Sequence, residues 1–202
     1  MFGLSKYRLF LVLIFLGAWF AAAIKPLFPH DWLLENFLVF LVPILLILFG
    51  KKLKWSDTSY TLLLILAVLH LMGSHYTYEH VPFGYVLGDW LGVQRNMYDR
   101  LVHFLFGLLM AYPAREVVVR LAGVRNGWSY YLPVDIILSL SALYEIIEWT
   151  SALRVAPELG LAFLGAQGDV WDAQTDMALA GTGAVIAMIL VWLLKKKFFK
   201  IV

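Results

Sequence analysis

The chain has 202 residues, of which 62% are hydrophobic and only 15% are charged, against about 25% charged residues in an ordinary soluble domain. A soluble domain of this length cannot bury so many apolar side chains, so the composition predicts a membrane protein. The net charge of +2 and the lack of a basic tract exclude a nucleic-acid-binding class, and the absence of Cys excludes disulfides, zinc–thiolate sites and thiol nucleophiles.

Six apolar segments follow one another along the chain, and each approaches the roughly 20 residues that a helix needs to cross the hydrocarbon core. They lie at about residues 8–24, 32–50, 58–76, 98–114, 133–153 and 174–194. Because lipid offers the backbone no hydrogen-bond partners, these segments are expected to be helical. The sequence therefore predicts an all-α polytopic bundle of six transmembrane helices in a single membrane domain, residues 1–202.

The first segment also has features of a secretory signal peptide. Lys6 and Arg8 precede the apolar run, and residues 21–23 are three alanines that would suit a signal peptidase. The apolar run is slightly longer than a usual signal core, which favours a retained transmembrane helix. Cleavage after Ala23 is the alternative, and it would leave the other five segments unchanged.

The distribution of Lys and Arg predicts the orientation of the bundle. Most of them lie before the first segment, between the second and third, after the fourth and after the sixth. The positive-inside rule then places both termini in the cytoplasm. Most acids and all His residues fall on the other side or near the middle of the third segment, which that rule does not explain. The long outer connections 77–97 and 154–173, rich in Gly, Pro and aromatic residues, are expected to form ordered caps.

Ionisable residues gather at the outer ends of four segments, in pairs three or four residues apart that share a helix face. The pairs are His75 and Glu79, Asp99 and His103, Glu145 and Glu148, and Asp172 and Asp176. Metal sites in helical bundles are built from such inward-facing carboxylates and imidazoles. The pattern predicts a site near the non-cytoplasmic face that can hold a divalent metal, with zinc, manganese and magnesium all open.

The predicted site contains candidates for three roles. The catalytic candidates are Asp99, His103, Glu145, Glu148, Asp172 and Asp176, the metal-ligand candidates are His75, Glu79, His103, Glu148 and Asp176, and the substrate-binding candidates are Arg95, Tyr98, Arg100 and Tyr144. Each residue alone also fits a helix cap, a solvated loop residue or a hydrogen-bonded core residue, as His70 does. Charged groups within a membrane segment cost about 2.5–3.5 kcal/mol each on insertion scales, so the group as a whole favours a function.

The same motifs carry a resemblance to known families. The stretches 75–79, 98–104, 144–149 and 167–177 resemble the YjdF family of small bacterial inner-membrane proteins, over nearly the whole chain. This resemblance implies the bacterial cytoplasmic membrane and no established activity.

A weaker similarity links the last three segments to VanZ-like membrane proteins, which are associated with glycopeptide resistance. It consists of Asp99-Arg100 before His103-Phe104, then Glu145 or Glu148, then Asp172 or Asp176 before Gly181. The chain departs from that pattern at Trp149, where a Gln near the Glu is expected. The similarity implies a role at the cell envelope and names no reaction.

Three functions fit this sequence. The leading hypothesis is a membrane-embedded enzyme that acts on a lipid or lipid-linked envelope substrate, with a metal or a carboxylate pair activating water or a hydroxyl. An ion-coupled transporter is an alternative, although the cytoplasmic halves of the segments contain few ionisable groups apart from Asp135 and no internal repeat is evident. A structural or partner-binding subunit is the third. The lipid bilayer is the expected partner, and the oligomeric state stays open.

Overall fold

The computed structural model describes residues 5–153 and 166–194, and in these ranges every regular element is an α-helix. Six helices are long and apolar enough to cross a membrane, as the sequence predicts. They are α1 (Lys6–Ala23), α2 (Pro29–Leu53), α3 (Asp57–Tyr76), α5 (Tyr98–Arg120), α6 (Trp128–Ala152) and α8 (Asp172–Leu194). The seventh described helix, α4 (Pro82–Leu91), is short and lies within the connection 77–97, which is therefore ordered as predicted.

Local sequence accounts for where several helices begin and end. The hydroxyls of Ser5 and Ser56 accept hydrogen bonds from backbone N–H groups in the first turns of α1 and α3, so both helices start at serine caps. Proline occupies the first turn of α2 and of α4, where its missing N–H costs nothing. Helix α4 ends at Gly92, whose φ of 69° is the left-handed conformation that glycine adopts readily.

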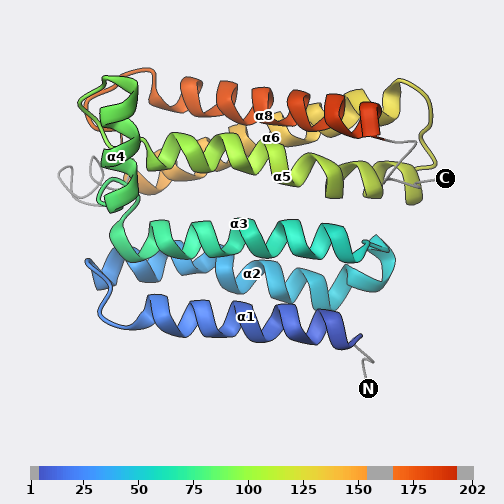
Figure 1. The fold of residues 1–202 in the computed structure, drawn as a ribbon, viewed down its shortest axis with the longest axis horizontal. Coiled ribbons are helices and arrows are strands. Elements are labelled where there is room, and N and C mark those ends of the chain that lie inside the picture. The colour runs from blue at the N-terminus through green and yellow to red at the C-terminus, as the bar shows by residue number, and fades with distance from the viewer. Residues whose placement is uncertain (1–4, 154–165, 195–202) are drawn as a thin grey trace.

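The long helices run beside one another, and α4 lies across their ends (Figure 1). Helices α1, α2 and α3 form one half of the bundle, and α5, α6 and α8 form the other. The two halves meet mainly where α3 packs against α5. The second half is the more tightly packed, and its most extensive contact is between α5 and α8.

Small residues bring the backbones of α5 and α8 together. A Cβ atom on Gly107 would overlap the carbonyl oxygen of Ala180, and a Cβ atom on Gly183 would overlap that of Phe104. Close approach of this kind is the main source of helix association in lipid, where no hydrophobic effect drives helices together. Beyond Ala180, the buried core continues along this seam through Ala184.

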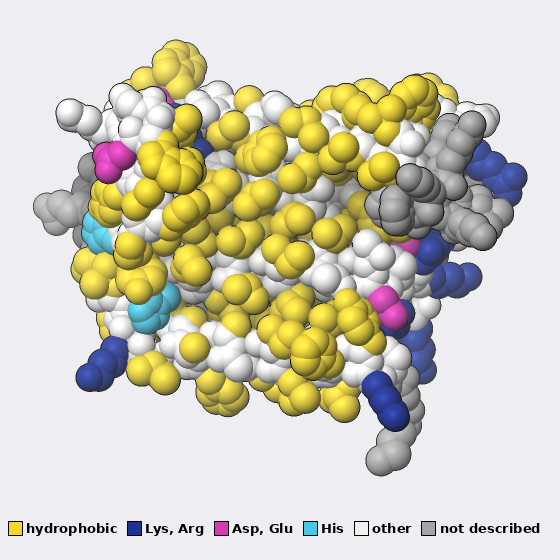
Figure 2. All heavy atoms as spheres, in the orientation of Figure 1, with side chains coloured by type: hydrophobic (Ala, Val, Ile, Leu, Met, Phe, Trp, Pro, Cys, Tyr) yellow, Lys and Arg dark blue, Asp and Glu magenta, His cyan; other side chains and the backbone are white. Residues whose placement is uncertain are grey.

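The two ends of the bundle differ in charge. On the face shown in Figure 2, Lys and Arg gather at the end opposite α4, and a hydrophobic belt covers the middle. We call these the basic end and the α4 end. The hydrophobic belt is the surface expected of a bilayer-spanning protein. Which end faces the cytoplasm, and whether α1 is cleaved, stay predictions.

Helix α5 continues six residues beyond its predicted end at 114, and α6 begins at Trp128 rather than at 133. The extension of α5 brings Glu116 and Arg120 into the helix. Glu116 is fully buried, accepts hydrogen bonds from Ser56 N (2.8 Å) and Ser59 Oγ (2.6 Å), and forms an ion pair with Arg120 Nη2 (2.9 Å). The helices therefore contain more ionisable groups near the basic end than the sequence predicts. The Glu116 carboxylate also connects α5 to the start of α3.

Replacing Gly107 with Ala is expected to lower the free energy of unfolding by about 1–3 kcal/mol, because the added methyl overlaps the backbone of α8. Gly17→Ala is the matched control, since a Cβ atom on Gly17 in α1 meets nothing within 4 Å. There the alanine should stabilise the helix slightly. Thermal unfolding in detergent, followed by circular dichroism, measures both. Equal melting temperatures for the two variants would contradict the close contact between α5 and α8.

Candidate functional site

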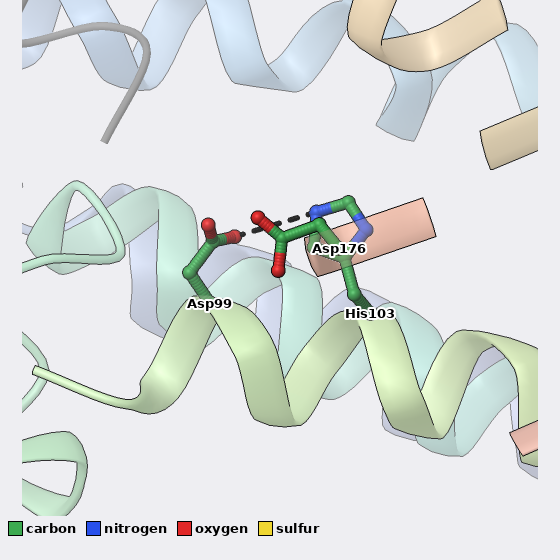
Figure 3. A group of neighbouring side chains, drawn as sticks. All are labelled: Asp99, His103 and Asp176. Atoms are coloured by element: carbon green, nitrogen blue, oxygen red, sulfur yellow. Dashed lines mark ion pairs between the residues drawn. The ribbon is translucent and has the colours of Figure 1, made fainter. Parts of the chain in front are cut away.

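Three ionisable side chains converge near the α4 end of the bundle. Asp99 and His103 come from α5 and Asp176 from α8, and Figure 3 shows them pointing toward one another. One ligand atom from each residue lies within 4.8 Å of the others, as in a site that can hold a metal ion. The imidazole Nε2 of His103 is 3.6 Å from Asp99 Oδ1.

The contact between α5 and α8 sets this geometry. Asp99 and His103 are one helical turn apart and therefore share a face of α5. Gly107 follows His103 by one turn, and Ala180 follows Asp176 by one turn. Because Gly107 lies directly against the backbone of Ala180, the preceding turns are brought opposite each other. The glycine contact thus places Asp176 beside His103.

The carboxylates at this centre are largely buried and incompletely paired. Asp176 is only 2% exposed, and within the described residues its Oδ1 has no hydrogen-bond partner. Glu145 on α6 adds a third carboxylate, with Oε1 3.8 Å from His103 Nε2 and likewise without a hydrogen bond in that part of the chain. Buried polar atoms without partners are costly and rare. Oxygen and nitrogen donors in this arrangement fit a divalent cation such as magnesium, manganese or zinc.

Two arginines beside the centre neutralise other acids. Arg95 Nη2 is 2.9 Å from Asp172 Oδ1, and Arg100 donates a hydrogen bond to Asp169. Asp169 lies outside the spanning helices, and its pKa is lowered by a hydrogen bond from the backbone N–H of Trp171 and by Arg100. These two acids are therefore balanced by the two arginines.

The acids of the centre itself lack such balance. Among the described residues, the imidazole of His103 is the only group within 4.0 Å of Asp99 and Glu145 that can carry a positive charge, and it converges with Asp176 as well. Carboxylates so close together cannot all stay ionised without protons or a bound cation. The distribution of charge therefore favours a cation at Asp99, His103 and Asp176 over an anion at the same atoms.

Helix α6 places further predicted residues along the centre. The ring of Tyr144 packs against the imidazole of His103, with centroids 6.2 Å apart. Glu148, one turn later, interacts with the Tyr144 hydroxyl and lies within electrostatic range of Asp99 and Glu145. Tyr144 and Glu148 thus border the centre, although Glu148 is outside the group whose ligand atoms converge.

Other predicted residues lie at the edge of the site. His75 Nδ1 is 2.9 Å from the backbone oxygen of Ala22, so this imidazole binds α1. Tyr98 is buried and donates to the backbone oxygen of Leu69, which makes it part of the core. Burial raises the pKa of Glu79, which lies near Asp172 and Arg95. The structure does not bring His75 or Glu79 into the converging group, and their role as ligands stays a prediction.

A second buried cluster was missed by the sequence analysis. Tyr78 OH is 2.5 Å from His70 Nδ1, and His70 Nε2 is 3.1 Å from the backbone oxygen of Glu35. Glu35 lies in turn within electrostatic range of Asp99. An acid inside the apolar second segment is a signal that could have drawn attention to Glu35. The reading of His70 as a hydrogen-bonded core residue agrees with these contacts.

The placement of Tyr78 depends on an unusual backbone. Thr77 and Tyr78 have φ values of 57° and 53°, a left-handed conformation that costs non-glycine residues about 1–3 kcal/mol. The ring folds back onto Gly73, where a Cβ atom would overlap it. Burial, followed by Glu35 and Asp99, raises the pKa of Tyr78 well above its usual value. The phenol therefore stays protonated and donates to His70.

Known proteins place the chain in a family. The family model "Predicted membrane protein (DUF2238)" matches residues 7–197. The chain belongs to this family. It is 38% identical over 189 residues to the inner membrane protein YjdF of Escherichia coli (strain K12), covering 92% of this chain and 86% of the relative. No solved structure gives a significant match. The chain is therefore an integral membrane protein, and neither comparison names a reaction.

Tyr78→Phe is expected to lower the free energy of unfolding by about 1–3 kcal/mol, because it leaves the His70 imidazole without its donor. Tyr85→Phe is the matched control, since Tyr85 is exposed and its hydroxyl makes only a 3.4 Å contact with His80. Thermal unfolding in detergent compares the two. A loss no larger for Tyr78→Phe than for Tyr85→Phe would show that the buried hydrogen bond contributes little.

Proposed function

We propose that the protein is a membrane-embedded enzyme that uses a divalent metal, held by Asp99, His103 and Asp176, to act on a lipid or lipid-linked substrate of the bacterial envelope. The observation that carries the proposal is the convergence of three ligand atoms, from two helices, within 4.8 Å of one another. The buried Oδ1 of Asp176, which has no hydrogen-bond partner among the described residues, supports it, because a cation there would satisfy that atom.

The proposed location is the bacterial inner membrane, with the α4 end toward the periplasm. The name of the Escherichia coli relative supports the first part, since that protein is an inner membrane protein. The accumulation of Lys and Arg at the basic end supports the second, because cytoplasmic loops carry an excess of both. The centre would then open toward envelope substrates.

Chemically, a bound divalent metal supplies Lewis acidity and a more acidic water molecule. The protein's own contribution is a carboxylate next to the ligands. Glu145 Oε1 is 3.8 Å from His103 Nε2 and has no hydrogen bond among the described residues, so it is free to accept a proton from an attacking water or hydroxyl. The ring of Tyr144, whose centroid is 6.2 Å from that of the imidazole, would help to orient His103.

A lipid-soluble substrate fits the surroundings of the site. Ile146 and Ile147, next to Glu145 in the sequence, are among the exposed apolar residues of the bundle. In a bilayer such residues face lipid, so Glu145 and Glu148 stand beside the acyl chains on α6. A substrate with an apolar tail could thus reach the carboxylates from the membrane.

The polar network of the basic end supports an enzyme over a carrier. Glu116 is fully buried, accepts hydrogen bonds from Ser56 and Ser59, and forms an ion pair with Arg120. A carrier needs polar groups that become accessible along a path between the two sides. A carboxylate whose partners are all within the protein is instead typical of a fixed structural contact.

Metal content measured by elemental mass spectrometry tests the centre. The detergent-purified wild type is expected to hold near-stoichiometric divalent metal, which His103→Ala and Asp176→Asn should lose because each removes a ligand. His80→Ala is the matched control, since His80 is exposed at the same end and outside the converging group. Glu148→Gln should also keep the metal, which tests the wider ligand set that the sequence predicts.

A stability measurement completes this test. Metal at about 100 times its Kd should raise the free energy of unfolding of the wild type by about 2.7 kcal/mol, and His103→Ala should not respond. Absence of metal from folded wild type, even after loading with zinc, manganese and magnesium, would rule out the metal centre. The acids would then form a proton-sharing structural network.

A further inference from the structure

Two arginines lie together beside the candidate metal centre. Arg95 comes from the connection before α5 and Arg100 from its first turn, and both face the residues that lead into α8. Arg95 Nη1 is 3.5 Å from Asp169 Oδ2, and Arg100 Nη2 is 3.5 Å from Asp172 Oδ1, in addition to the closer pairs. The four charges form a compact and balanced group.

The arginines have more hydrogen-bond donors than their acid partners use. Arg95 Nε and Nη1 and Arg100 Nε are buried and donate no hydrogen bond within the described residues. The side chains are only 12% and 17% exposed, so water does not readily replace the missing acceptors. Buried donors without acceptors are rare in native structures and call for a further partner.

A phosphate group has the acceptors that these donors lack. Its oxygens match the planar fork of a guanidinium in paired hydrogen bonds, and arginine is the residue best suited to such contacts. Helices α5 and α8 both begin at this end, so their N-terminal dipoles also favour an anion. Asp99 of the metal centre lies within electrostatic range of Arg95 and Arg100. A phosphate held here would therefore adjoin a bound cation.

Asp169 is the partner that an incoming anion can replace. Its side chain is 31% exposed and belongs to the connection before α8, whereas that of Asp172 is 10% exposed and fixed in the helix. One oxygen of Asp169 accepts from the backbone of Trp171, and the other faces the two arginines. Turning Asp169 away would free both guanidiniums for an anion while Asp172 kept its place.

We propose that Arg95 and Arg100 bind the phosphate group of the substrate, and that Asp169 holds these arginines until the phosphate displaces it. This inference rests on the proposed function and adds the chemical class of the substrate, a compound with a phosphate group. The group recognised in either case is a phosphate with free terminal oxygens. It belongs either to a lipid headgroup or to free inorganic phosphate. Exchange of one anion for another keeps the arginines paired, and the adjacent cation offsets the additional negative charge.

Isothermal titration of the full-length protein in detergent, with manganese present, tests this site. The probes are inorganic phosphate and dihexanoyl phosphatidic acid. Asp169→Asn is expected to bind phosphate about tenfold more tightly because the internal competitor is gone, and Arg100→Gln about tenfold more weakly because charge-assisted hydrogen bonds are lost. Asp57→Asn is the matched control, since Asp57 pairs with Arg8 at 2.7 Å at the basic end and should not affect affinity.

The outcomes separate the sources and the two proposals. Binding of both probes supports recognition of the phosphate itself, binding of phosphatidic acid alone supports a lipid source, and binding of inorganic phosphate alone supports a free one. If neither probe binds, or if folded Asp169→Asn binds no more tightly than wild type, the phosphate site is wrong. Metal content is measured on the same samples. Phosphate binding to protein without metal would contradict the metal centre and leave the phosphate site standing.

Discussion

The backbone contact between α5 and α8 determines both the packing of the bundle and the geometry of its polar centre. Gly107 and Gly183 allow each helix to lie against a carbonyl of the other, at Ala180 and Phe104. In lipid there is no hydrophobic driving force for helix association, so such close contacts must supply much of the attraction between the helices. The same contact fixes the rotation and register of both helices. As a result, Asp176 and His103, which lie one turn before the contact, face each other.

This arrangement divides the ionisable groups into two environments. At the basic end, one oxygen of Glu116 accepts hydrogen bonds from Ser56 and Ser59 and the other pairs with Arg120, so the carboxylate joins α3 to α5. At the α4 end, Asp176 and Glu145 keep buried oxygens without hydrogen bonds in the described part of the chain. Each carboxylate is costly to place in a membrane. Glu116 is compensated by its partners, whereas the described residues offer no hydrogen bond to Asp176 Oδ1 or Glu145 Oε1. The difference separates a structural network from a site that requires a cation or protons.

Much of the fold could be predicted from the sequence, because the lengths of apolar segments and the requirement for internal backbone hydrogen bonds decide it. The end of α5 could not be predicted in this way. The charged residues Arg115 and Glu116 indicate the end of a membrane segment unless it is known that both are buried. In the site, the spacing of Asp99 and His103 predicts a shared face. Which acid meets them depends on rotation of a distant helix, and periodicity alone does not contain that information.

The Tyr78 cluster shows why part of the site lies beyond sequence reasoning. Its contact with His70 arises from two consecutive left-handed residues after α3 and from the space above Gly73, and neither feature has a motif of its own. Strain of this kind persists only where surrounding contacts hold it, and it concentrates at functional sites. Through Glu35 the cluster brings a carboxylate of α2 near Asp99, so the α4 end is the region where both halves of the bundle contribute ionisable groups to one polar interior.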